Sequence, residues 1–150
     1  MVHSRQRPQV IVGVDGSACG IAALRTAAAE AIRRGTPLHA VRVRPSVFTP
    51  VDDYTEIDQA LAEAFGTLPG GLDVRRETLA PPVAAALVGR AHHPGDLLVL
   101  GSGGCREPAW RPRHWSRSVV RACLRTARCA VVVVAADSPA ARREPAQPLV

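Results

Sequence analysis

The sequence contains no lysine, so all of its basic side chains apart from histidine are arginines. A P-loop is therefore excluded, because that motif holds the nucleotide phosphates through a lysine. An enzyme that forms a Schiff base on lysine is excluded for the same reason. Aromatic residues make up only 3% of the 150 residues, and the arginines are spread along the chain. Despite a net charge of +6, we therefore do not expect a nucleic-acid partner.

Long apolar segments and metal-binding patterns are also missing. No apolar run approaches the roughly 20 residues of a membrane-spanning helix, and the first residues lack the apolar core of a signal peptide. The four cysteines show neither C-x-x-C nor zinc spacing, and the five histidines are scattered. We therefore expect a cytoplasmic protein with reduced thiols, no membrane contact and no metal site.

Short apolar segments alternate with segments of helical periodicity along the chain. The expected strands are residues 9–15, 38–44, 72–79, 97–100 and 129–134, and the expected helices are residues 18–34, 53–67, 81–91 and about 118–127. This order predicts an α/β fold, a doubly wound parallel sheet of five strands in one domain over residues 9–136. Residues 1–8 and 137–150 are expected to be a flexible N-terminus and a disordered tail.

The helix expected over residues 18–34 has clear start and stop signals. Asp15 or Ser17 can cap its first turn, and Gly35 follows its last turn. Its predicted buried stripe consists of Ile21, Leu24, Ala28 and Ile32. For the last helix, Ser116 or Ser118 is the expected cap, and the expected apolar positions are Val119, Val120, Cys123, Leu124 and Ala127. The last strand, at residues 129–134, is expected to be buried.

A glycine-rich loop directly follows the strand at residues 97–100. It reads Gly101-Ser102-Gly103-Gly104, so no bulky side chain blocks the approach of a ligand to its backbone amides. A helix begins after this loop, and helix N-termini at the carboxyl end of a parallel sheet bind anions. The sequence therefore predicts an anion-binding site at this edge.

Three segments together resemble the universal stress protein family: VIVGVDGS at the first strand, APPVAAALVGRA before GDLLVLGS, and RSVVRACLRTARCAVVVVA at the end. The resemblance covers about residues 9–136. It implies a flavodoxin-like, Rossmann-like sheet of strand order 3-2-1-4-5 and a stress-response regulator that binds ATP or a related adenine nucleotide, with Mg²⁺ as an optional companion. It also implies a homodimer paired through the last strand, and a protein that is not an enzyme.

The resemblance also implies ligand contacts at individual positions. Gly13 and Asp15 match positions near the adenosine, and Val43 matches a valine whose backbone meets the adenine. The loop of Gly101, Ser102, Gly103 and Gly104 matches the segment that wraps the ribose and phosphates. Ser118 and Val119 match the end of a G-S-V element that binds phosphate.

The chain departs from the family pattern at that last element. Three extra residues separate the glycine loop from Ser118, and Arg117 stands where the family has glycine. The Arg117 guanidinium can pair with a phosphate, or it can occupy the site and leave it without nucleotide. Binding of another anion is a third outcome.

Several features have two interpretations. The inserted segment at residues 105–115, with Trp110 and Trp115, forms either a lid over the nucleotide or a loop packed on the protein's own surface. Arg117, Arg121 and Arg125 form either a solvated helix face or a docking surface for an acidic partner. The apolar last strand fits either a dimer contact or burial within the sheet. The alternatives to a nucleotide-dependent regulator are a nucleotide-free dimeric scaffold and, least favoured, an ATP-hydrolysing enzyme with His114 as its base.

Overall fold

The computed structural model describes residues 7–103 and 117–135. Strands and helices alternate along the chain, as the sequence predicts. The strands are β1 (Val10–Gly13), β2 (Leu38–Val43), β3 (Val74–Leu79), β4 (Leu97–Gly101) and β5 (Ala130–Val134). The helices are α1 (Ala18–Arg34), α2 (Thr55–Phe65), α3 (Val83–Arg90) and α4 (Arg117–Thr126). The expected bounds differ from these by a few residues at most. Of the N-terminus predicted to be flexible, residues 1–8, residues 1–6 lie outside the described part of the chain, as does the tail at 137–150.

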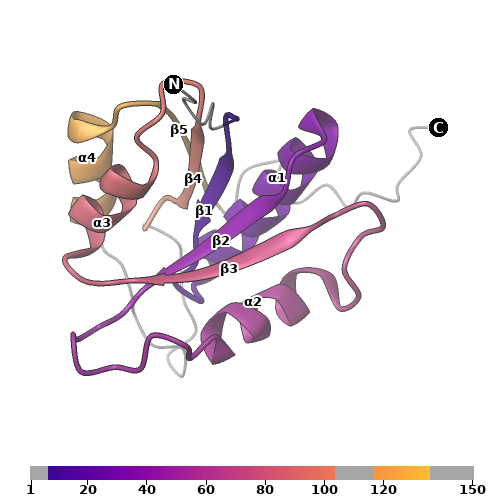
Figure 1. The fold of residues 1–150 in the computed structure, drawn as a ribbon, viewed down its shortest axis with the longest axis horizontal. Coiled ribbons are helices and arrows are strands. Elements are labelled where there is room, and N and C mark those ends of the chain that lie inside the picture. Colours follow the sequence, from indigo (N-terminus) through magenta and orange to yellow (C-terminus); the bar gives the residue numbers. More distant parts are fainter. Residues whose placement is uncertain (1–6, 104–116, 136–150) are drawn as a thin grey trace, which may run out of the picture.

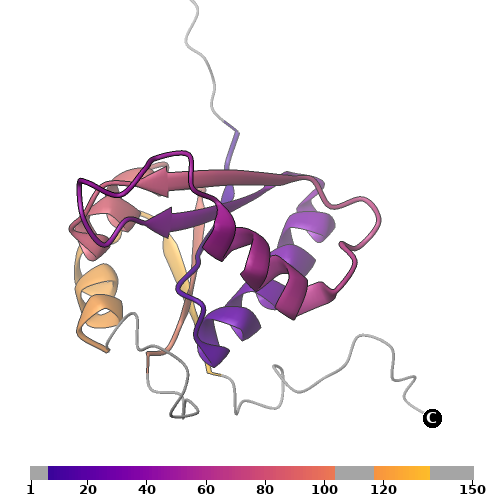
Figure 2. The ribbon, with the colours of Figure 1, turned by 90° about the horizontal axis from the view of Figure 1, so that it is seen from below.

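The five strands form one parallel sheet in the order β3-β2-β1-β4-β5. The expected α/β fold and the strand order 3-2-1-4-5 are both confirmed. Helices α1 and α2 cover one face of the sheet, and α3 and α4 cover the other (Figure 1). The two helical layers on either side of the strands are seen from below in Figure 2. All strands point the same way, so their carboxyl ends share one edge of the sheet.

Successive residues of the central strand β1 pack on opposite faces of the sheet. Val10 and Val12 of β1 pack in the core beneath α1 and α2, whereas Ile11 packs in the core beneath α3 and α4. All three are completely buried. Burial on both faces explains why the central strands read as continuous apolar runs in the sequence.

Helix α1 begins and ends where the sequence predicts. The Ser17 hydroxyl accepts a hydrogen bond from the Gly20 amide and caps the first turn. Gly35 adopts a left-handed conformation with φ of 66° and ends the helix. The buried stripe differs from the prediction in its last turn, because Ile32 is 42% exposed while Ala31 is completely buried. Ala31 faces the sheet at this turn, which leaves Ile32 at the rim of the contact.

Three expectations for the C-terminal elements are wrong. Leu124 of α4 is 54% exposed, because Val120 and Cys123 already fill the narrow contact of this helix with the core. Ser118 is not a cap, because α4 begins one residue earlier; Ser116 lies outside the described residues. Strand β5 is not buried either: Val132 and Val133 are 37% and 39% exposed, because β5 is an edge strand.

Candidate functional site

The predicted ligand residues gather at the carboxyl edge of the sheet. Gly13 is the last residue of β1, Val43 the last of β2 and Gly101 the last of β4. Because β1 lies between β2 and β4 in a parallel sheet, the ends of these three strands are neighbours. Open α/β sheets bind their ligands outside this edge.

Asp15 follows the end of β1 and is turned toward the start of α1. Its Oδ1 atom accepts hydrogen bonds from the Ser17 amide, at 2.9 Å, and from the Ser17 hydroxyl, at 2.6 Å. The residue is only 6% exposed. Gly20 leaves the space that the carboxylate occupies, since a β-carbon at this position would lie 2.3 Å from Asp15 Oδ1. Gly20 was not singled out from the sequence, because only the folded chain brings it against Asp15.

Gly101 lets the end of β4 approach the first turn of α1. A β-carbon here would lie 2.7 Å from both the Cys19 carbonyl carbon and the Gly20 amide nitrogen. These are backbone atoms, so no side-chain rotation could relieve the contact. The glycine at this position is therefore required for packing, in addition to any role toward a ligand.

Ser102 and Gly103 follow Gly101 in the glycine loop. The Ser102 amide donates to the Val134 carbonyl oxygen at 2.9 Å and so continues the pairing of β4 with β5. The Ser102 hydroxyl lies 3.2 Å from the sulfur of Cys19. Gly103 has a φ of 72°, in the left-handed region that favours glycine. The fourth loop residue, Gly104, lies outside the described residues.

Cys19 corrects one expectation from the sequence. It takes part in a disulfide bond, so the prediction of reduced thiols is wrong for this residue. Cys123 and Cys129 are free thiols. Burial raises the pKa of the thiol of each, so both are held in the protonated, less reactive form.

The residues at the end of β2 are buried. Val43 is 6% exposed and packs with the core on the α3 side; that its backbone meets the adenine stays a prediction. The preceding residue, Arg42, points to the opposite face and is also 6% exposed. Its Nε donates to Glu56 Oε2 at 2.7 Å, while its Nη1 is buried and has no hydrogen-bond partner among the described residues. No sequence pattern indicates this buried cation.

The phosphate-binding residues expected after the loop form the first turn of α4. Arg117 and Ser118 are exposed and Val119 is partly buried. No acidic residue stands in this turn, and no ion pair of Arg117 is found within the described ranges. The inserted segment at residues 105–115, with His114 and both tryptophans, lies outside these ranges, so its two interpretations stay predictions.

The whole of this fold matches one known family. The sequence profile of the universal stress protein family covers residues 7–135. The chain belongs to this family. None of the curated proteins matches it significantly.

Solved universal stress proteins share its fold. A universal stress protein in complex with cAMP is 23% identical, with a TM-score of 0.64 over 85% of this chain and 96% of the other. A universal stress protein from Archaeoglobus fulgidus in complex with dAMP is 21% identical, with a TM-score of 0.58 over 85% and 98% of the two chains. UspA from Lactobacillus plantarum is 25% identical, with a TM-score of 0.56 over 87% and 99%.

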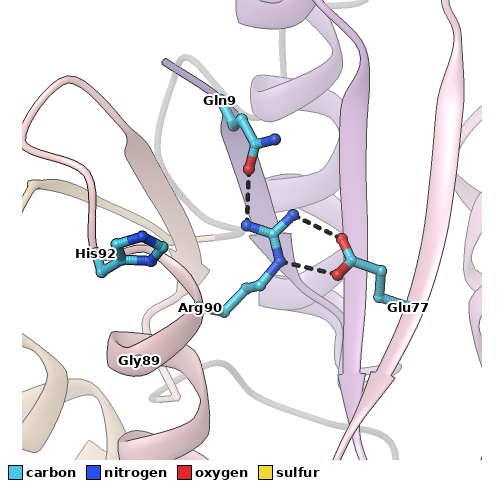
Figure 3. Close-up of a pocket in the computed structure, with 5 residues that line it drawn as sticks. All are labelled: Gln9, Glu77, Gly89, Arg90 and His92. Carbon is cyan, nitrogen blue, oxygen red and sulfur yellow. Dashed lines mark hydrogen bonds and ion pairs between the residues drawn. The ribbon is translucent and has the colours of Figure 1, made fainter. Parts of the chain in front are cut away.

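This universal stress protein has a polar pocket at the opposite edge of the sheet. The pocket measures about 290 Å³ and is lined by Gln9, Glu77, Gly89, Arg90 and His92. In Figure 3, Arg90 reaches from the end of α3 between Gln9, which precedes β1, and Glu77 of β3. Its Nε and Nη2 each donate to one Glu77 oxygen at 2.8 Å, and its Nη1 donates to Gln9 Oε1 at 2.7 Å.

The charged side chains around this pocket pair with one another. His39 Nδ1 lies 3.1 Å from Glu77 Oε2. Hydrogen bonding to His39, and then to Arg90, lowers the pKa of Glu77 to about 2. These groups therefore clamp β3 and α3 to the segment before β1. These groups compensate one another, whereas Arg117 at the carboxyl edge has no ion-pair partner among the residues that the structure describes.

The described part of the chain contains neither a metal-binding cluster nor a membrane-spanning helix. Residues 7–103 and 117–135 contain no group of three or more histidine, cysteine, aspartate or glutamate residues that could hold a metal ion. Over the same residues, no helix has both the length and the apolar character needed to cross a membrane.

Proposed function

We propose that this universal stress protein is a cytoplasmic regulator of the stress response that binds ATP or a related adenine nucleotide and does not turn it over. The observation that carries the proposal is the exposed Arg117 in the first turn of α4, which forms no ion pair within residues 7–103 and 117–135. It stands beside the edge where Gly13, Val43 and Gly101 end their strands and Asp15 follows β1. The relatives solved with cAMP and dAMP support an adenine nucleotide as the ligand.

The residues fit the parts of such a ligand. The Val43 backbone would meet the adenine, and Asp15 would accept a hydrogen bond from the adenosine through the carboxylate oxygen that Ser17 does not use. The Gly103 amide, the first turn of α4 and the Arg117 guanidinium would bind the phosphates. No metal-binding cluster exists among the described residues, so Mg²⁺, if it enters, would be held mainly by the phosphates.

A second candidate is a nucleotide-free scaffold, and two observations favour it. The Ser102 amide is engaged by Val134, and one oxygen of Asp15 already accepts two hydrogen bonds from Ser17. Both groups are therefore partly satisfied without a ligand. In this alternative, Arg117 would take the place of the phosphates and the protein would act through protein contacts alone.

Replacing Arg117 distinguishes the two candidates. If Arg117 pairs with phosphate, Arg117→Ala weakens ATP binding about 10- to 100-fold, since a hydrogen bond to a charged group contributes about 1.5–3 kcal/mol. Adenosine binding stays unchanged, because adenosine carries no phosphate. Isothermal titration calorimetry with ATP, AMP and adenosine measures this difference.

The matched control is Arg121→Ala, one turn further along the exposed side of α4. It removes the same charge and should leave ATP binding within about twofold. Tighter ATP binding by Arg117→Ala than by the unmodified protein would favour the scaffold, as would no saturable binding by either. ATP hydrolysis measured in the same samples tests the proposed absence of turnover.

We also propose that the protein is a homodimer paired through β5. The exposed valines of this edge strand, Val132 and Val133, would be a hazard if left uncovered. Val133→Glu should give a monomer in sedimentation experiments, because pairing across a two-fold axis brings the two carboxylates close together. Val47→Glu, at a 60% exposed loop position, is the control and should leave the dimer intact. A Val133→Glu protein that still dimerises would contradict the proposed interface.

A further inference from the structure

Helix α4 packs one face against the core and exposes arginines and a leucine to solvent. Val120 and Cys123 are buried, whereas Arg121, Leu124 and Arg125 are exposed. With 3.6 residues per turn, these three exposed positions fall within about 100° of one another around the helix. Arg128 lies two residues after the end of the helix and is also exposed. We call Arg121, Leu124, Arg125 and Arg128 the α4 arginine face.

Most other arginines in the described part of the chain are paired with a carboxylate. The ion pairs are Arg33 and Arg34 with Glu30, Arg42 with Glu56, Arg75 with Asp73, Arg76 with Asp58, and Arg90 with Glu77. Arg25 and Arg44 donate to backbone carbonyl groups instead. A carboxylate thus neutralises six of these ten arginines, which is the more common arrangement in the described part of the chain.

The α4 arginine face departs from this arrangement. Helix α4 contains no acidic residue, and none of Arg121, Arg125 and Arg128 forms an ion pair with any described residue. The face therefore gathers three uncompensated positive charges around one exposed leucine, which is 54% exposed. Such a concentration of one charge creates a local field that attracts a complementary partner.

We propose that the α4 arginine face is a docking surface for an acidic segment of another protein, one that carries carboxylates together with an apolar side chain. The carboxylates would pair with the guanidinium groups, which bind carboxylates in a bidentate manner. The apolar side chain would cover Leu124, which supplies the apolar centre that protein interfaces have.

Two other occupants fit the face less well. A single-stranded nucleic acid is bound through aromatic side chains on which its bases stack, and the face has none. A second copy of this chain in a two-fold arrangement would place the same surface against itself, which brings guanidinium groups together. Charge complementarity therefore favours an acidic protein segment over both.

The α4 arginine face adjoins the proposed nucleotide site, because Arg117 lies one turn before Arg121 on the same exposed side of α4. The face itself is defined without Arg117, and its test uses no nucleotide. The proposal therefore does not rest on nucleotide binding, and either can fail without the other.

The test uses a short fluorescein-labelled peptide of glutamate, alanine and leucine, and measures its binding to the full chain by fluorescence anisotropy. The main variant is Arg121→Gln together with Arg125→Gln. The matched control is Arg33→Gln together with Arg75→Gln, at two side chains that are 69% and 60% exposed. Both double variants lower the net charge of +6 by the same amount. Thermal unfolding followed by circular dichroism confirms that each is folded.

We expect the α4 double variant to bind the peptide about 10-fold more weakly, and the control to bind within about twofold of the unmodified protein. Leu124→Ser should weaken binding about threefold, as should a peptide with serine in place of leucine. Equal weakening by both double variants would show attraction to net charge alone and overturn the proposal. Tighter binding of single-stranded DNA than of the peptide, with the same sensitivity to the α4 variant, would also overturn it. So would a lack of peptide binding at low salt, where charge attraction is strongest.

Discussion

The close contact between β4 and α1 predicts that a glycine-to-alanine substitution destabilises the protein at Gly101, although the same change stabilises it at Gly89. Gly101→Ala places a methyl group 2.7 Å from two backbone atoms of α1, so the backbone itself must move. Overpacking of this kind costs up to about 3 kcal/mol. Glycine loses more backbone entropy on folding than alanine, so replacing it in a strand also stabilises the folded state by about 0.5–1 kcal/mol. We therefore expect the free energy of unfolding to fall by about 2 kcal/mol.

Gly89→Ala is the counterpart, since it makes the same chemical change in α3. A β-carbon at Gly89 meets no atom within 4 Å, so the methyl group is accommodated without a clash. The gain in helix propensity is about 0.8–1 kcal/mol. The two alanine variants should thus differ by about 3 kcal/mol, with opposite signs relative to the unmodified protein.

Urea unfolding followed by circular dichroism measures both variants. With a slope of about 2 kcal/mol per molar urea, the midpoint of Gly101→Ala should fall by roughly 1 M and that of Gly89→Ala should rise by roughly 0.5 M. A Gly101→Ala protein as stable as the unmodified chain would refute the close contact between β4 and α1. It would also remove the packing explanation for glycine at the start of the loop.

Two further predictions concern polar contacts. Glu77→Gln should destabilise the protein by about 1–2 kcal/mol at neutral pH, since it breaks the ion pair with Arg90. The pKa of Glu77 is lowered from 4.5 to about 2 in the folded protein. The ionised carboxylate therefore stabilises the fold above about pH 4.5, and this stabilisation is lost as the pH falls toward 2. The difference between the two proteins in urea midpoint should therefore shrink over that pH range, and a constant difference would contradict the role of the charge. Ser17→Ala should cost about 1 kcal/mol through loss of the α1 cap. In the control Ser46→Ala, the lost hydroxyl accepts from the Phe48 amide in an exposed loop, so the urea midpoint should change by less than half as much; equal shifts would argue against the cap.

The fold could be predicted from the sequence because its signals are local. Strands buried on both faces give continuous apolar runs, as in residues 97–100, and the cap at Ser17 and the stop at Gly35 depend only on neighbouring residues. The carboxyl edge was predicted for the same reason, since it follows from strand direction and order.

Features that depend on distant residues could not be predicted. Arg90 meets Glu77 and Gln9, which lie 13 and 81 residues away in the sequence. The mutual fit of Gly101 with Gly20 arises only when β4 packs on α1. Leu124 has helical spacing from buried residues, but spacing does not say how wide the buried contact is, and here Val120 and Cys123 complete it.

Two arginines show how the two edges of the sheet differ. At the amino edge, Arg90 has Glu77 and Gln9 as acceptors, so its charge is compensated in the folded chain. At the carboxyl edge, Arg117 stands in the first turn of α4, where the helix dipole disfavours a cation by about 0.3–1 kcal/mol, and no described carboxylate offsets this cost. An anion placed there would interact favourably with both the guanidinium and the helix N-terminus. Within the described residues the charge of Arg117 is thus not offset, and this is the physical reason for the proposal that a nucleotide phosphate binds at this edge.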